Sequence, residues 1–179
     1  MKLILIFSAR KDFLLANQSN KFISSEITVS KLRIISREAS VNKPIEEVFN
    51  FFAKAVNLNI ITPPELKFKI TTPLPIEMKI GTLIDYKIKL NGISFKWKTE
   101  ITDWLPPYRF VDTQLKGPYR VWIHEHIFGS QGNKTIVKDI VSYLPPGWIL
   151  EPVIHRLAVK KKLEHIFDYR MEKIKSIFS

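Results

Sequence analysis

Short alternating segments separated by turn-forming dipeptides narrow the folds open to this chain more than any other feature of its sequence. Between residues 81 and 143, apolar and polar residues alternate with the period of two that a half-buried strand requires. Asn91-Gly92 is a strong signal for a tight hairpin, and Gly117-Pro118 and Gly132-Asn133 separate the later segments. Closely spaced segments of this kind predict a meander of antiparallel strands.

Two short helices are expected after the first strand. Asn42 is suited to cap the first helix, Pro44 to its first turn, and Glu46 and Glu47 to its positive end. The second helix should cover about residues 55–61 and end before a proline pair. The expected strands cover residues 31–41, 66–70, 81–90, 95–104, 110–115, 120–128 and 134–143.

One long amphipathic helix is expected from about Pro152 to the C-terminal end. Its apolar stripe comprises Val159, Leu163, Ile166, Phe167, Met171, Ile174 and Phe178. Val153 and Leu157 belong to a slightly offset stripe, which predicts a bend near Lys160. A helix of ~25 residues is ~38 Å long, so a twisted meander must curl around it. We therefore expect an α+β fold in which a curved antiparallel sheet wraps around the C-terminal helix and leaves a cavity.

The domain organisation follows from where this patterning begins. A chain of 179 residues suits one domain. Residues 1–30 lack a comparable pattern, so we expect an N-terminal arm, ordered or not, followed by one domain over residues 31–179. The longest apolar run of the arm, from Leu3 to Phe7, is far shorter than the ~20 residues of a membrane span. The chain contains no cysteine, which fits a reducing compartment and leads us to expect a cytoplasmic protein.

The chain is strongly basic. Its formal net charge of +11 at pH 7 favours anionic partners such as nucleic acid or an acidic membrane surface. The lysines are spread along the sequence, however, so a solvated surface is the simpler interpretation. Lys87, Lys89, Lys96 and Lys98 should face outward together on two paired strands. We expect transient contact with an anionic membrane surface at most, and we do not expect nucleic acid to be a partner.

Five segments carry a family resemblance: residues 44–49 (PIEEVF), 57–64 (NLNIITPP), 104–112 (WLPPYRFVD), 117–126 (GPYRVWIHEH) and 163–170 (LEHIFDYR). With the order of expected elements, they resemble a bacterial ligand-binding branch of the START-like, or helix-grip, superfamily. Polyketide cyclase/dehydrase-like and coenzyme-Q-binding proteins belong to this superfamily. The resemblance spans about residues 31–179 and implies a helix-grip fold that binds a small hydrophobic molecule. It provides no catalytic residues to carry over.

The expected strand over residues 120–128 is the most informative about function. Its alternation places Trp122, His124, His126 and Phe128 on one face, and aromatic size together with the resemblance favours this face as the inner one. An apolar wall with a few convergent polar groups is the usual composition of a small-molecule site. The expected cavity wall comprises Tyr86, Trp97, Thr99, Asp112, Gln114, Trp122, His124, His126, Asp139 and Tyr143.

Three interpretations of His124 and His126 remain open. In the first, each imidazole satisfies a buried aspartate or tyrosine and is purely structural. In the second, the rings contact a ligand, and a neighbouring carboxylate from Asp112 or Asp139 tunes them for proton transfer. In the third, which we favour least, the pair and an aspartate bind a metal ion. The expected site therefore contains no metal and no cofactor.

The sequence thus favours a binding or transport protein for a lipid, a quinone or a polyketide-like aromatic. The alternative is a cyclase or dehydratase that uses a His/Asp pair in the same cavity, with His124, His126, Asp112 and Asp139 as catalytic candidates. Whether the chain is an enzyme stays open, although binding is favoured. A second alternative is an electrostatic binder of nucleic acid or of an acidic partner. The remaining histidines, His155 and His165, are expected at the surface or at an edge.

Overall fold

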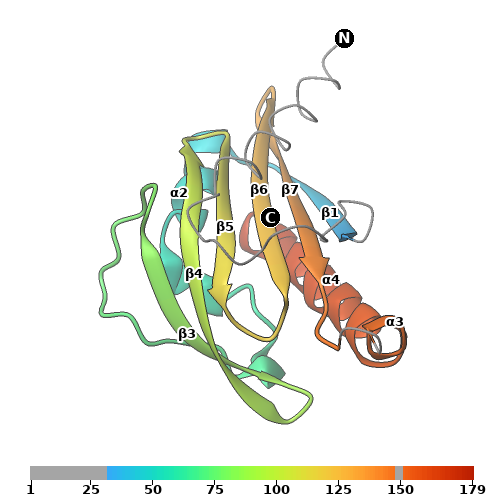
Figure 1. Ribbon diagram of the computed structural model, residues 1–179. Helices are drawn as coiled ribbons and strands as arrows, with labels where there is room; N and C mark the ends of the chain where they lie inside the picture. The colour runs from blue at the N-terminus through green and yellow to red at the C-terminus, as the bar shows by residue number, and fades with distance from the viewer. Residues whose placement is uncertain (1–31, 148–150) are drawn as a thin grey trace. The chain divides into compact units, whose positions relative to one another are not determined.

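The computed structural model describes residues 32–147 and 151–179, so the predicted N-terminal arm concerns residues outside this described part. The described residues form a strand, short helices, an antiparallel meander and a long C-terminal helix, in the expected order. The α+β class is therefore confirmed, and Figure 1 shows the curved sheet with the long helix on one of its faces. No helix of the described part is both long and apolar enough to cross a membrane.

The strands of the described part form one seven-stranded sheet in the order β1-β7-β6-β5-β4-β3-β2. Their bounds are β1 (Arg33–Val41), β2 (Lys69–Ile70), β3 (Leu83–Leu90), β4 (Ile93–Leu105), β5 (Arg109–Lys116), β6 (Val121–Gln131) and β7 (Lys134–Leu144). Each neighbouring pair is antiparallel. Because β1 pairs along its whole length with β7, the first and last strands of the sequence lie side by side.

The tight hairpins lie where the turn dipeptides predict them. Asn91 (φ 49°) and Gly92 (φ 85°) both have positive φ, and this lets two residues connect β3 to β4. Gly132 (φ 61°) performs the same function between β6 and β7.

The strand predicted over residues 66–70 is wrong in most of its length, because only β2 pairs with a neighbour. A short 3₁₀-helix, η3 (Pro64–Leu66), precedes it. Lys67 (φ 44°) then adopts the left-handed conformation, so the backbone becomes extended only after it.

The predicted short helices are present. α2 (Ile45–Phe52) begins directly after Pro44, with two glutamates in its first turn. The predicted cap at Asn42 is wrong, because the cap position belongs to Pro44, whose extended backbone (ψ 149°) directs the chain into the helix. The second helix is a single 3₁₀ segment, η2 (Ala55–Asn59).

The C-terminal helix contains a change of helical type. α3 (Glu151–Ile154) continues into η5 (His155–Val159), which is π-helical, and then into α4 (Lys160–Ile177). A π-helical turn contains more residues than an α-helical one and therefore rotates the buried face of the helix. This rotation accounts for the two offset apolar stripes: Leu157 is 74% exposed, whereas Leu163 on the main stripe is 2% exposed. The change of type ends at Lys160, where the sequence predicts a bend.

The core lies between α2, α4 and the inner face of the sheet. Its side chains include Phe49 and Phe52 from α2 and Phe167 and Ile174 from α4. Fully burying a large apolar side chain stabilises the folded state by about 1.5–3 kcal/mol, so these contacts hold α4 against the sheet. The predicted inner face of β6 is confirmed, because the four side chains Trp122, His124, His126 and Phe128 are each at most 8% exposed.

Candidate functional site

The register of three neighbouring strands brings two histidines and two aspartates together. His124 and His126 lie two residues apart on β6, so their rings project from the same face, with centroids 3.8 Å apart. Asp112 on β5 pairs directly opposite His124, and Asp139 on β7 pairs directly opposite His126. The two carboxylates therefore approach the histidine pair from opposite sides.

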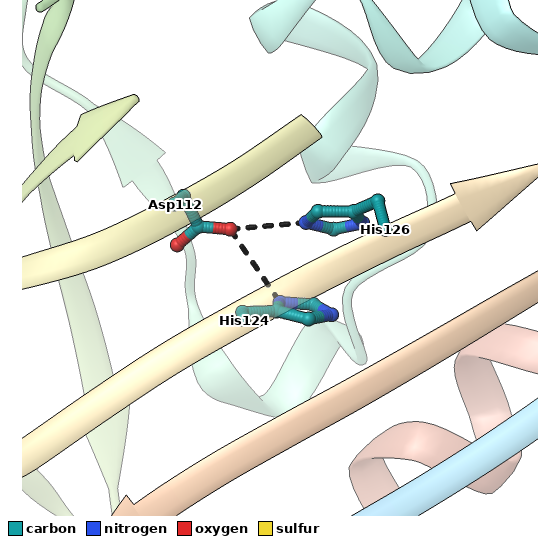
Figure 2. Close-up of side chains that lie close together, drawn as sticks. All are labelled: Asp112, His124 and His126. Atoms are coloured by element: carbon teal, nitrogen blue, oxygen red, sulfur yellow. Dashed lines mark hydrogen bonds and ion pairs between the residues drawn. The ribbon is translucent and has the colours of Figure 1, made fainter. Parts of the chain in front are cut away.

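The Asp112 carboxylate contacts both imidazoles. Its Oδ2 atom lies 3.0 Å from His126 Nε2 and 3.6 Å from His124 Nδ1, as Figure 2 shows. Its other oxygen, Oδ1, accepts a hydrogen bond of 3.1 Å from the Thr99 hydroxyl. Because Thr99 comes from β4, four adjacent strands contribute to this cluster of ionisable side chains.

Asp139 contacts the same rings through their other nitrogens. Its Oδ1 atom lies 2.9 Å from His126 Nδ1 and 3.1 Å from His124 Nε2. These contacts are close but poorly aligned, because Asp139 Oδ1 and His124 Nε2 are buried atoms without a well-directed hydrogen bond from any described residue. Such under-satisfied groups are uncommon in a folded interior and require an explanation.

Arg170 completes the cluster from α4. Its Nε atom donates a 2.5 Å hydrogen bond to Asp139 Oδ2, and its Nη2 atom lies 3.2 Å from His126 Nδ1. The guanidinium carbon also lies 5.3 Å from the centre of the Phe52 ring. The side chains of Arg170 and Asp139 are 6% and 0% exposed, so this ion pair is almost fully removed from solvent.

The charges of the cluster decide which histidine holds a proton. Two ionised carboxylates and one guanidinium leave one negative charge, which a single imidazolium balances. Burial opposes that charge at both rings, but at His126 the hydrogen bond with Asp112 and the close carboxylate of Asp139 outweigh it and raise the pKa. At His124, burial and the neighbouring His126 charge lower the pKa. An additional proton on the pair is therefore favoured at His126 over His124.

Both carboxylates stay ionised in this arrangement. Burial alone would raise the pKa of Asp139, but the charge of Arg170 and the histidine contacts hold it well below its usual range. Burial likewise opposes ionisation of Asp112, but the hydrogen bond with His126 and the nearby His124 ring outweigh it and lower its pKa.

A cavity of about 110 Å³ lies between α4 and the inner face of the sheet, beside this cluster. Its wall is mainly apolar and aromatic, and its ionisable members converge at one end. The wall comprises Leu58, Thr62, Leu66, Phe68, Tyr86, Ile88, Leu90, Trp97, Asp112, Tyr119, Trp122, His124, His126, Leu163, Ile166, Phe167 and Arg170. Three of its aromatic rings form a continuous surface: Tyr86 stacks on Trp97 at 5.6 Å, and Trp97 meets Trp122 edge-on at 5.3 Å.

The structure places six of the ten residues expected in the wall there: Tyr86, Trp97, Asp112, Trp122, His124 and His126. The other four lie outside the wall. Thr99 and Asp139 support the cluster from behind. The amide of Gln114 donates 2.7 Å to the carbonyl of Tyr119 and thus holds the turn between β5 and β6. The Tyr143 hydroxyl lies 2.9 Å from His155 Nε2.

Sequence reasoning missed Arg170 as a member of the site. The signal was available, because Arg170 follows Phe167 by three residues and precedes Ile174 by four, so it lies on the buried stripe of the helix. A charged residue at such a position needs a buried partner of opposite charge. The wall residues from η2 and η3 gave no comparable signal.

The expectation for His155 is wrong. This side chain is 8% exposed, because the π-helical turn η5 directs it toward Tyr143 on β7. His165 is at the surface as expected, where it lies 2.9 Å from a carboxylate oxygen of Glu65.

A second hollow, the outer groove, lies at the β3–β4 pair and has no histidine in its lining. This groove of about 540 Å³ is lined by Lys87, Lys96 and Lys98 from the β3–β4 pair and by residues 71–73. Lys87 and Lys96 pair directly opposite one another, and Lys98 is 3.3 Å from Asp85. The predicted outward direction of these lysines is confirmed.

Comparison of the chain with protein-family models gives no match, and comparison with curated proteins gives none either. Solved structures do match. The Zhui aromatase/cyclase from Streptomyces sp. R1128 superposes with a TM-score of 0.65 at 16% identity, covering 81% of this chain and 92% of that one. Ginseng major latex-like protein 151 from Panax ginseng matches with a TM-score of 0.61 at 10% identity, covering 83% and 98%.

A protein from Arthrobacter aurescens, solved by solution NMR, matches with a TM-score of 0.64 at 14% identity over 87% of this chain and 91% of that one. These matches and the architecture above define a helix-grip fold, which this chain shares with the aromatase/cyclase and the latex-like protein. Identities this low establish the fold alone, so the function is argued from the site.

Proposed function

We propose that the protein binds a small, largely apolar molecule in the cavity beside α4 and holds a polar group of that molecule against the Asp112–His124–His126 end. The observation that carries this proposal is the composition of the cavity wall, in which aromatic and aliphatic side chains surround one cluster of ionisable groups. Such a wall favours apolar ligands, and the few polar groups determine their orientation.

A buried donor supports a ligand with an acceptor oxygen. The indole Nε1 of Trp97 has no acceptor among the described residues, although it is buried in a side chain that lines the cavity. An unpaired buried donor costs about 1–3 kcal/mol, which a ligand carbonyl or hydroxyl oxygen would offset. Quinones and polyketide-like aromatics carry such oxygens on an apolar frame.

The size of the cavity limits what fits without movement. At about 110 Å³ it is smaller than the ~300–1,000 Å³ of drug-sized ligand pockets. A lipid, quinone or polyketide therefore requires the wall to open. The half-buried side chains of Leu58, Thr62 and Phe68 belong to η2 and the loops around η3, and because they reach both the cavity and the solvent, these segments are where the wall is proposed to open.

A cavity-filling variant tests the proposal. I166F adds volume at the cavity wall, and L157F adds the same ring to an exposed position of the same helix. Native mass spectrometry of protein purified from cells should find a bound apolar mass on the wild type and on L157F, and less of it on I166F. An unliganded mass for all three proteins, together with no binding of added quinone or naphthol, would contradict the proposal.

The second candidate is a cyclase or dehydratase acting in the same cavity. His124 favours this enzyme function, because its lowered pKa keeps the ring neutral and able to accept a proton. Asp139 lies 3.1 Å from Nε2 of this ring. Burial raises the pKa of Tyr86 well above its usual value, so its hydroxyl stays available as a donor to a developing oxyanion. The enzyme function holds if the wild type changes the mass of the bound ligand and H124Q binds the same ligand without changing its mass. An unchanged ligand mass with the wild type excludes it for that ligand.

The outer groove supports a transient contact with an anionic membrane surface, since Lys87 and Lys96 face outward side by side. Such a contact would let a cytoplasmic carrier collect an apolar ligand from a bilayer. Vesicles containing phosphatidylserine should retain the wild type at low salt and retain the variant K87E/K96E less.

A further inference from the structure

We infer that Asp112, His124 and His126 form a binding site for one divalent transition-metal ion. The donor atoms are Asp112 Oδ2, His124 Nδ1 and His126 Nε2, which all lie within 4.8 Å of one another. This inference goes beyond the proposed binding of an apolar molecule and does not depend on it, because metal binding requires no ligand in the cavity.

The spacing of the donor atoms fits a metal ion. With bonds of 2.0–2.2 Å to zinc, two ligands of a tetrahedral site lie about 3.3 Å apart. Asp112 Oδ2 lies 3.0 Å from His126 Nε2 and 3.6 Å from His124 Nδ1. Shifts of a few tenths of an ångström therefore suffice for these two pairs, and the third pair, His124 Nδ1 and His126 Nε2, lies within 4.8 Å. Figure 2 shows both rings directed at the same carboxylate oxygen.

The surrounding residues support the same donor set. Metal-bound imidazoles almost always donate their second N–H to a carboxylate or carbonyl. If His126 binds through Nε2 and His124 through Nδ1, both remaining ring nitrogens lie near Asp139 Oδ1, at 2.9 and 3.1 Å. Thr99 holds the Asp112 oxygen that the metal does not use. The two buried atoms that lack a well-directed partner, His124 Nε2 and Asp139 Oδ1, are close enough for this hydrogen bond, and a small rotation of the ring or the carboxylate would form it.

A proton is the competitor for this position. Without metal, one proton beyond those of the two neutral rings balances the charges of Asp112, Asp139 and Arg170. A divalent ion with both imidazoles neutral instead leaves one positive charge, which a bound hydroxide or a carboxylate ligand would balance. Arg170 Nη2, 3.2 Å from His126 Nδ1, can donate only to a ring nitrogen without hydrogen, so it opposes the Nδ1–H that either a metal at Nε2 or a second ring proton requires.

The cavity leaves a coordination position open. Three protein ligands plus an open position are typical of catalytic and ligand-binding metal sites, whereas structural sites are closed. Asp112, His124 and His126 all line the cavity, whose volume of about 110 Å³ holds a few water molecules at ~30 Å³ each. A metal ion would therefore face the space in which the apolar molecule is proposed to bind.

Metal titration of the full-length, untagged chain tests this inference. After chelator treatment, the wild type should bind one Co²⁺ per chain with visible absorption bands of a four- or five-coordinate ion, and Zn²⁺ should displace it. D112N and H124Q should abolish the bands. D139N, which removes the orienting carboxylate and also the charge that Arg170 pairs with, should weaken binding by about 10–100-fold in the folded protein. H165Q removes an exposed imidazole and should bind like the wild type.

X-ray absorption on the zinc-loaded wild type requires no variant to fold. It should show two imidazole ligands and one carboxylate oxygen at about 2.0–2.2 Å. Three results would each overturn the inference: no stoichiometric binding by the wild type, binding that folded D112N and H124Q retain unchanged, or a first shell with fewer than two imidazoles. Loss of binding in H165Q would do the same, since it would locate the ion at the surface.

Discussion

Replacing Arg170 with methionine should be among the most destabilising single substitutions in this chain. The variant leaves Asp139 buried without its counter-ion, and methionine keeps most of the apolar contacts of the arginine stem. Removing one partner of a buried ion pair costs about 3–5 kcal/mol. Because the two side chains are 6% and 0% exposed, solvent screening reduces this figure little. In a domain of this size, the loss corresponds to a fall in Tm of about 6–20 °C.

Urea unfolding followed by tryptophan fluorescence measures the effect. The control is R37M, because Arg37 Nε also contacts an aspartate at 2.5 Å, in a pair with Asp168 whose side chains are 32% and 58% exposed. An exposed pair contributes about 1 kcal/mol at most, so R37M should change the unfolding midpoint little. The double variant R170M/D139N should recover part of the loss, since it removes the unpaired charge. If R170M loses no more stability than R37M, the buried cluster does not have the ionisation states described above.

Three further predictions concern stability. Burial opposes ionisation of Asp139, but Arg170 lowers its pKa well below the usual value, so the contribution of this carboxylate to the stability of the folded state is complete above pH ~4 and is lost as the pH falls further. The urea midpoint of the wild type should therefore be lower at pH 3 than at pH 6, and the midpoint of D139N should fall less. Equal falls in the two proteins would contradict this prediction. G92A should cost about 1 kcal/mol in thermal unfolding because of its φ of 85°, whereas G129A, where an added methyl meets nothing within 4 Å, should not. Y143F should cost about 1 kcal/mol by removing the 2.9 Å contact with His155, and an unchanged Tm would show that this contact contributes nothing.

Local signals in the sequence predict much of this fold. Asn91-Gly92 specifies a hairpin by itself, because few residue pairs tolerate two positive φ angles. The alternation on β6 likewise fixes which side chains share a face, since a strand has a period of two. Short-range patterning therefore gives the meander and the inner face that carries His124 and His126, whereas the pairing of β1 with β7 is a long-range contact that it does not give.

Long-range contacts explain what the sequence does not predict. The period of β5 places Asp112 and Gln114 on one face, yet only Asp112 reaches the cavity, because Gln114 bonds to the turn at Tyr119. The partner of Asp139 comes from α4, 31 residues along the chain, and no strand pattern indicates it. The cavity volume depends on how the rings of the wall pack, which residue spacing alone does not determine.

NMR titration with 2-naphthol tests the central claim of an interior apolar site most directly. The indole N–H signals of Trp97 and Trp122 report on the cavity wall, whereas Trp104 packs against Phe49, outside that wall, and is an internal control. We expect saturable shifts of the Trp97 and Trp122 signals and a nearly unchanged Trp104 signal. Shifts that do not saturate, or that affect all three indoles equally, would contradict the claim that the ligand binds between α4 and the sheet.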